Sequence, residues 1–231
     1  MNIEEFVNKV KELNIDITDD ILSKLDIYYK FLVEYNSHTN LTAITDQNDV
    51  YLKHFYDSLT IAKSIDLSTV ESLIDVGTGA GFPGMVIAIC YPNITVTLLD
   101  SNNKRINFLN ELVNKLGITN VITVHDRSEI YAKNHKDMYD VVTARAVKNM
   151  KELTELCLPL VKVNGYFIPL KGLINDELAN AKDIVNNING VVEDIISFEL
   201  PNGDTRNIIK IKKTDKCPSK YPREYKYIVK Q

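Results

Sequence analysis

The residues with the clearest chemistry lie in one short stretch, DVGTGAGFPG at positions 75–84. It follows a short apolar run at 72–76 and precedes an apolar stretch of helical type at 85–89. Glycines at such a junction let the backbone approach a ligand closely and permit positive φ values. The first N–H groups of a helix attract anions. The stretch therefore predicts a ligand-binding loop at the end of a strand.

Two cofactor classes fit the glycine spacing. The last three glycines match the dinucleotide pattern G-x-G-x-x-G, with Asp100 about twenty residues further on. The first three glycines, led by Asp75, match D-x-G-x-G-x-G, which resembles the first motif of S-adenosylmethionine-dependent methyltransferases of the Rossmann-like class; they are Gly77, Gly79 and Gly81. We favour the second class because Asp75 ends the strand and because Pro83 lacks the N–H that a pyrophosphate would use.

The elements that must position this loop alternate between strand and helix. Strands are expected at 72–76, 95–100, 120–124, 139–144 and 165–170, and helices at 104–116, 150–160 and 175–187. This alternation predicts a parallel sheet with helices on both faces. Two further strands, at 191–200 and 206–212, flank an Asn-Gly turn and predict a hairpin. The expected fold is therefore α/β: a Rossmann-like class I methyltransferase sheet, mostly parallel with a C-terminal antiparallel hairpin.

Three parts of the chain are expected to differ in character. Residues 1–70 form a helical N-terminal extension packed on the core, with a polar loop at 36–40 and a third helix at about 50–64. Residues 71–213 form the methyltransferase domain, and residues 214–231 form a basic C-terminal tail. From Arg206 onward the chain has nine Lys and Arg against two Asp and Glu, so this end is +7 and the remainder of the −4 chain is −11.

A basic end on an acidic body favours an anionic partner such as nucleic acid. Tyr221, Tyr225 and Tyr227 lie among these charges, and aromatic rings between cations can stack on bases. The alternative interpretation is a solubilising tail that contacts nothing.

Composition excludes several classes of protein. With 231 residues, 45% hydrophobic and 25% charged, the chain has the make-up of a globular domain and not of a disordered one. No apolar run approaches the ~20 residues of a membrane span, and the acidic start is unlike a signal peptide. Cys90, Cys157 and Cys217 lack C-x-x-C spacing, which argues against a disulfide scaffold and a cysteine zinc site. We expect a cytoplasmic monomer without a metal.

Ligands of open α/β sheets bind outside the carboxyl ends of the strands. Asp100 ends the second expected strand, where its carboxylate can accept both ribose hydroxyls of a cofactor; alternatively it caps the following helix. Residues 125–129 follow the third strand, where enzymes of this class hold adenine. Phe82 either supplies an apolar wall to the site or packs in the core.

The end of the fourth strand, VTARA at 142–146, restricts the acceptor. It has neither the Asn/Asp-Pro-Pro-Tyr/Phe motif of exocyclic amino methylases nor a Pro-Cys nucleophile. A ring nitrogen with its own lone pair, such as guanine N7, fits because it needs no general base. Arg145 can bind a carboxylate, a phosphate or the guanine edge, or form a structural salt bridge. Lys171 ends the fifth strand, where it either contacts RNA or is solvated.

The ordered motifs along nearly the whole chain resemble the glucose-inhibited division protein B family, also called small-subunit ribosomal RNA methyltransferase G. The matching segments are Asn36 with NLTAI at 40–44, HFYDSL at 54–59, the loop at 75–84, LDS at 99–101, KR at 104–105, FL at 108–109, RSE at 127–129, RA at 145–146, LKG at 170–172, Arg206 and YPR at 221–223. Tyr35 stands where the family often has Trp.

This resemblance implies an enzyme that methylates N7 of one guanine in 16S rRNA, with S-adenosylmethionine as methyl donor. It assigns the cofactor to Gly77, Phe82, Ser128, Glu129 and Arg145, with Asp100 on the ribose, and the loop pattern adds Gly79 and Gly81. RNA contacts are expected from His54, Lys171, Arg206 and Arg223.

Arg145 and Lys171 are expected to position the acceptor. Neither His54 nor Asp57 is expected to transfer a proton. The expected partner is 16S rRNA in the small subunit or an assembly intermediate. An NAD-dependent oxidoreductase and a non-catalytic RNA-binding protein remain the alternatives.

Overall fold

The computed structural model describes residues 1–145, 148–174 and 176–230. It contains a seven-stranded sheet of order β3-β2-β1-β4-β5-β7-β6. The strands are β1 (Ser72–Val76), β2 (Thr95–Asp100), β3 (Val121–His125), β4 (Tyr139–Arg145), β5 (Val161–Lys171), β6 (Gly190–Glu199) and β7 (Thr205–Lys213). Strands β1 to β5 are parallel, whereas β7 runs antiparallel to β5 and to β6. The predicted mostly parallel sheet with an antiparallel C-terminal hairpin is confirmed.

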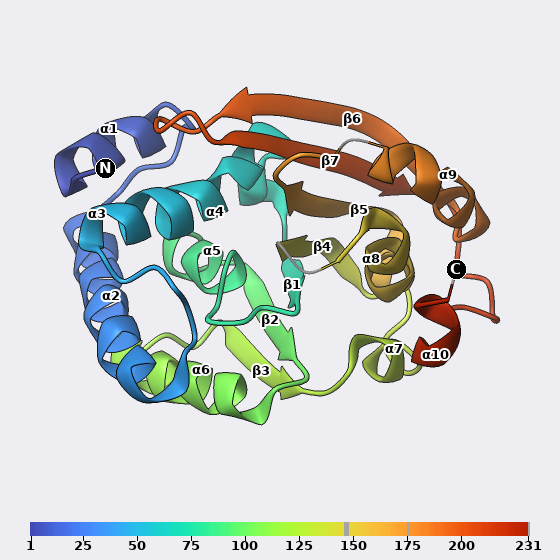
Figure 1. Cartoon of the computed structure of the whole chain (residues 1–231), viewed down its shortest axis with the longest axis horizontal. Helices are drawn as coiled ribbons and strands as arrows, with labels where there is room; N and C mark the ends of the chain where they lie inside the picture. Colours follow the sequence, from blue (N-terminus) through green and yellow to red (C-terminus); the bar gives the residue numbers. More distant parts are fainter. Residues whose placement is uncertain (146–147, 175, 231) are drawn as a thin grey trace.

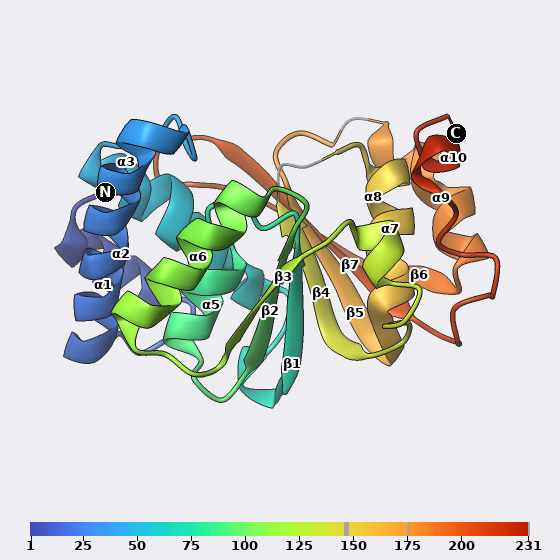
Figure 2. The same cartoon turned by 90° about the horizontal axis from the view of Figure 1, so that it is seen from below.

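Helices cover both faces of the sheet (Figures 1 and 2). One face carries α1 (Ile3–Lys11), α2 (Asp19–Thr39), α5 (Gly84–Cys90) and α6 (Asn103–Leu116). The other face carries α7 (Ser128–Tyr131), α8 (Met150–Cys157), α9 (Glu177–Asn187) and α10 (Tyr225–Ile228). A separate cluster of buried apolar side chains fills the space on each side. Among the described residues, no helix combines the length and the apolar character that crossing a membrane requires.

The N-terminal helices differ from expectation in two places. The polar loop predicted at residues 36–40 is wrong, because α2 continues to Thr39 and ends at Asn40, whose φ of 50° is left-handed. The helix predicted at 50–64 changes type along its length: α3 (Gln47–Val50), a π-helical segment (Tyr51–Tyr56), α4 (Asp57–Leu59) and a 3₁₀ turn (Thr60–Lys63). A π-helical segment inside a helix often marks a functional site.

Two short helices, α7 and α10, and a longer β5 are further departures from the sequence-based expectation. The helix expected from residue 175 begins at Glu177, and Asn175 lies outside the described residues.

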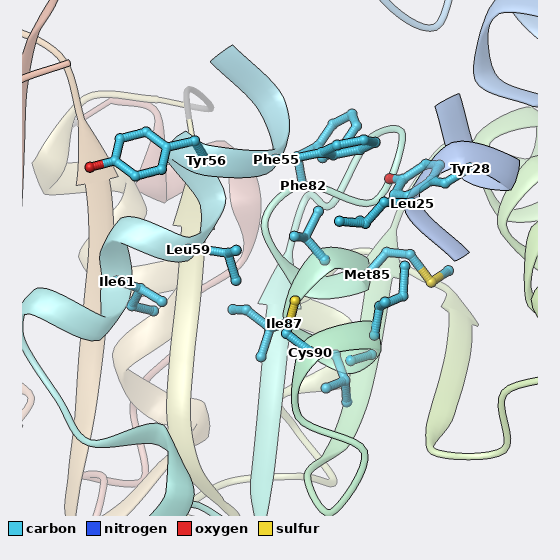
Figure 3. Close-up of a cluster of buried hydrophobic side chains, with 14 of the residues drawn as sticks. Leu25, Tyr28, Phe55, Tyr56, Leu59, Ile61, Phe82, Met85, Ile87 and Cys90 are labelled. Atoms are coloured by element: carbon cyan, nitrogen blue, oxygen red, sulfur yellow. The ribbon is translucent and has the colours of Figure 1, made fainter. Parts of the chain in front are cut away.

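The N-terminal helices pack directly on the glycine loop (Figure 3). Tyr28 of α2 stacks on Phe82 with ring centroids 5.3 Å apart, and Phe55 packs against both rings. The hydroxyl of Tyr28 donates a hydrogen bond to the carbonyl of Ala80 at 2.5 Å. A loop that is rich in glycine therefore has its conformation fixed by aromatic side chains from the N-terminal part of the chain.

Substitution of Gly84 tests how tightly the loop packs. An alanine Cβ at this position would lie 2.8 Å from the Asp75 Cβ and would also overlap the side chain of Leu98. We expect Gly84→Ala to lower the free energy of unfolding by about 1–3 kcal/mol, as overpacking of a core does, measured by urea denaturation. The control is Gly172→Ala, where a Cβ meets nothing within 4 Å. Equal effects of the two substitutions would contradict this account.

Candidate functional site

A cavity of about 470 Å³ opens at the carboxyl ends of β1, β2 and β4. Its volume lies in the range of small-molecule and cofactor sites. Of the residues that the sequence assigned to a cofactor, seven line this cavity: Gly77, Gly79, Phe82, Asp100, Ser128, Glu129 and Arg145.

Gly81, the eighth residue of that set, is not among the lining residues. A Cβ at Gly81 would lie 2.6 Å from the Tyr28 hydroxyl oxygen and 2.8 Å from the Met85 Cβ. Its backbone therefore lies against α2 and α5, where a larger residue has no room.

The buried carboxylate of Asp75 binds two residues of the glycine loop. Oδ2 of Asp75 accepts hydrogen bonds from Thr78 Oγ1 at 2.7 Å and from the Gly84 N–H at 2.8 Å. Burial raises the pKa of Asp75 to about 6. Because the first N–H of α5, that of Gly84, is bound to Asp75, this donor is not available to a pyrophosphate. This arrangement disfavours the dinucleotide interpretation of the loop.

Asp100 connects the loop to the end of β2. Its Oδ2 accepts from the Gly79 N–H at 2.9 Å and from Arg105 Nη1 at 3.2 Å, and its Oδ1 accepts from the Asn102 N–H at 2.8 Å. Gly79 has a φ of +62°, which glycine adopts without strain. Asn102 is the N-cap of α6, so the alternative that Asp100 caps this helix is wrong.

Ser128 and Glu129 begin α7, directly after β3. The hydroxyl of Ser128 donates to the carbonyl of Leu156 at 2.6 Å, and Glu129 accepts from Arg127 Nε at 2.5 Å. Both side chains are buried. The segment that the sequence predicted as a cofactor-binding loop is therefore tied to α8 and forms one end of the cavity.

Arg145, at the end of β4, is surrounded by residues of the N-terminal helices. Its Nη1 donates to the Lys53 carbonyl at 3.0 Å and to Asp57 Oδ2 at 3.3 Å, and its guanidinium lies over the Phe82 ring at 5.2 Å. Asp57 also accepts from Arg206 Nε through its other oxygen, at 3.0 Å. One buried carboxylate therefore joins two guanidinium groups from β4 and β7.

His54, from the same helical stretch as Asp57, binds the other terminal nitrogen of Arg145. Arg145 Nη2 lies 3.1 Å from His54 Nδ1, and His54 Nε2 lies 3.0 Å from Thr42 Oγ1. Because a guanidinium only donates, Nδ1 is the acceptor, and the Nε2–H donates to Thr42. Asn36 fixes Thr42 through two hydrogen bonds of 2.9 Å. Burial, assisted by the Arg145 charge, lowers the pKa of His54 to about 3, so the imidazole is neutral.

A second cavity, of about 520 Å³, lies beside the first. The two cavities share His54 and Arg145, which therefore form a common wall. Among the described residues, four cationic side chains line the second cavity, against two carboxylates; the cations are Lys53, Arg145, Lys171 and Arg206, and the carboxylates are Asp57 and Asp204. Its surface is therefore net positive.

The remaining residues expected to contact RNA differ in their surroundings. Lys171 lines the second cavity but is not simply solvated, because its Nζ donates to the Lys148 carbonyl at 2.7 Å and pairs with Glu177 at 2.8 Å. Arg223 lies in neither cavity lining and forms a bidentate pair with Glu155, at 2.8 Å from Nε and 2.5 Å from Nη2.

Sequence reasoning missed several lining residues. Arg105, Lys148 and Tyr225 all line the first cavity, and Thr42 connects it to α2. Thr42 and Arg105 lie inside motifs that the family resemblance had matched, which was the only available signal. The position of Tyr225 depends on how the C-terminal segment packs on the rest of the fold, and no local sequence pattern predicts that packing. Ala146, part of the expected Arg-Ala pair, lies outside the described residues.

Comparison with known proteins gives close relatives over nearly the whole chain. A family model described as rRNA small subunit methyltransferase G matches residues 21–209. The Ribosomal RNA small subunit methyltransferase G of Bacillus cytotoxicus is 47% identical, and that of Bacillus subtilis 46%, each over 97% of this chain and 95% of the relative. A SAM dependent methyltransferase from Aquifex aeolicus has a TM-score of 0.55 at 18% identity, covering 75% of this chain and 97% of its own. This structural likeness concerns the fold.

The neutral His54 gives a prediction for acid stability. Because the folded-state pKa of about 3 lies below the ordinary value of 6.5, the unfolded chain binds one more proton between these values. The free energy of unfolding should therefore decrease as the pH is lowered through this window, by about 1.4 kcal/mol per pH unit from this group. We expect His54→Gln to remove this part of the slope, measured by urea denaturation between roughly pH 6 and pH 4. An equal loss of slope in His38→Gln, which removes an exposed imidazole, would contradict it.

The shared carboxylate gives a second prediction. Asp57→Asn removes the negative charge between Arg145 and Arg206, and a charge left near the interior without its partner costs about 3–5 kcal/mol when fully buried. Both guanidinium groups keep some access to solvent, so we expect about 2–3 kcal/mol of lost stability. Asp204→Asn is the matched control, because this half-exposed carboxylate lies 3.8 Å from Arg206. The account fails if the control is as destabilising as Asp57→Asn.

Proposed function

The chain belongs to the rRNA small subunit methyltransferase G family, and from this premise we propose that it transfers a methyl group from S-adenosylmethionine to N7 of one guanine in 16S rRNA. The single observation that carries this proposal is the wall of His54 and Arg145 between two cavities of different character. One cavity suits a nucleoside cofactor, and the other suits an anionic polymer. A methyl group transferred from one cavity to the other would move next to these two side chains.

The residues of the first cavity fit S-adenosylmethionine. Val76, Leu99 and Leu156 give it an apolar surface, which suits an adenine ring. Asp100 supplies a carboxylate for the ribose hydroxyls, and binding there would replace Arg105 on Oδ2. Arg145, at the other end, suits the carboxylate of the methionine part. When bound, this cofactor supplies a sulfonium methyl group, and the bond to N7 forms as the bond to sulfur breaks.

The second cavity suits the target nucleotide. Its net positive lining attracts the RNA backbone, and Arg206 and Lys171 come from neighbouring strands at its rim. A guanine in this cavity would meet the first cavity at Arg145. We do not assign an RNA contact to Arg223, because its guanidinium is bound to the buried Glu155.

The chemistry of N7 suits the groups at this wall. N7 carries a lone pair and no proton, so methyl transfer requires alignment and exclusion of water, and no base. His54 is neutral but its Nδ1 is bound to Arg145, and both oxygens of Asp57 are bound to guanidinium groups. These residues therefore serve to hold Arg145 in place. Correct positioning alone can supply about 7–11 kcal/mol of a barrier.

The test is methyl transfer from labelled S-adenosylmethionine to 16S rRNA and to small subunits that lack N7 methylation. Products are mapped by a cleavage reaction specific for N7-methylguanine. We expect label at one guanine, a loss of at least 100-fold in rate with Arg145→Ala, and a rise of about 10-fold in KM for RNA with Arg206→Ala, since each removes a positioned cation.

The matched control is Lys182→Ala, which removes an exposed cation of α9 that is in the lining of neither cavity. Label on another atom of the RNA would contradict the proposed acceptor but keep the methyltransferase. Binding of RNA without binding of S-adenosylmethionine would instead favour a non-catalytic protein. Comparing naked rRNA with assembled subunits identifies which form is the partner. Such a substrate would place the protein in the cytoplasm.

A further inference from the structure

The C-terminal segment after β7 is packed on the fold. Arg223 pairs with Glu155 of α8, whose side chain is fully buried. Tyr221 is also buried, and Ile228 of α10 belongs to the apolar cluster beneath α8 and α9. Figures 1 and 2 show α10 on the same face of the sheet as α7, α8 and α9. The segment expected to be a basic tail is therefore anchored by one ion pair and two apolar side chains.

This anchoring brings Tyr225 to the first cavity, whose wall it forms together with residues from β1, β2 and β4. The guanidinium carbon of Arg127 lies 4.2 Å from the centre of the Tyr225 ring. Lys148 Nζ donates a hydrogen bond to the Tyr225 hydroxyl at 2.6 Å and pairs with Glu152 at 2.8 Å. The ring is thus held from two sides, by the segment after β3 and by the segment before α8.

We propose that Tyr225 is a cofactor-binding residue, and that the C-terminal segment closes the adenine end of the S-adenosylmethionine site. Its partner Arg127 adjoins Ser128 and Glu129, which form the end of the cavity after β3. An aromatic ring suits this place because it presents apolar area to a base while its hydroxyl remains hydrogen-bonded. The inference rests on the proposed cofactor and is independent of the RNA atom that is methylated.

The charge pattern of the sequence favours a different role for the same segment, and the two roles are separable. A tail that binds RNA would lose RNA affinity when its tyrosines are replaced, and its cofactor affinity would not change. If the segment instead forms a wall of the cofactor site, replacing Tyr225 would lower the affinity of the protein for the cofactor, even when no RNA is present. Tyr227 provides the matched control, because it lies on the same short helix but is exposed and outside the cavity lining.

The experiment compares Tyr225→Ala, Tyr225→Leu, Tyr225→Phe and Tyr227→Ala in the full chain. The Kd for S-adenosylmethionine is measured by calorimetry without RNA, and the Kd for 16S rRNA by filter binding. We expect Tyr225→Ala to raise the cofactor Kd about 10-fold, with a smaller rise for Tyr225→Leu and less than 3-fold for Tyr225→Phe, which keeps the ring. Tyr227→Ala should leave the cofactor Kd unchanged, and RNA affinity should not fall with Tyr225→Ala.

A second ligand tests which end of the cofactor the ring covers. 5′-Methylthioadenosine carries the adenine and ribose without the amino acid, so its Kd should rise by the same factor with Tyr225→Ala. Thermal melting without ligand reports whether each variant is folded. If Tyr225→Ala is unfolded, the cofactor Kd of Tyr225→Leu serves as the test instead. A cofactor Kd within twofold of the unchanged protein in the folded variants would overturn the inference. Failure of the unchanged protein itself to bind S-adenosylmethionine would instead refute the proposed function.

Discussion

The site depends on one buried carboxylate, that of Asp57, which lies between the guanidinium groups of Arg145 and Arg206. These three side chains come from α4, from the end of β4 and from β7, so the ion pairs join the N-terminal helices to two strands of the sheet. Each charge lies near the interior, where its partner compensates the loss of water. The wall between the two cavities therefore has its shape only when all three segments are in place.

The N-terminal helices belong to the site as much as the sheet does. Hydrogen bonds lead from Asn36 to Thr42, from Thr42 to His54 and from His54 to Arg145. A second set of contacts leads from Tyr28 to the glycine loop, through its hydroxyl and through its stacking on the Phe82 ring. Phe82 thus has both of the roles that were expected as alternatives. Its ring packs against Tyr28 in the core, and it also lines the first cavity.

The sequence was most informative where local pattern decides structure. The alternation of strands and helices, the Asn-Gly hairpin and the family resemblance are all confirmed. The polar residues at 36–40 were wrongly predicted to form a loop, because Asn36 sits in a helix and bonds to Thr42 beyond its end. The Asp57 bridge and the place of Tyr225 depend on contacts between distant segments, which no periodicity reports. The ion pair between Arg223 and Glu155 is a contact of the same kind, because its two residues lie 68 positions apart.

The β6–β7 hairpin has a consequence for how the protein folds during and after its synthesis. It brings Arg206 to Asp57, 149 positions earlier in the chain. During synthesis the N-terminal helices and the first five strands leave the ribosome well before β7 and α10. A growing chain can form the glycine loop and its aromatic support, but it has neither the second cavity nor the wall that Tyr225 provides. The finished arrangement of both cavities therefore forms only after the last residues of the chain have left the ribosome.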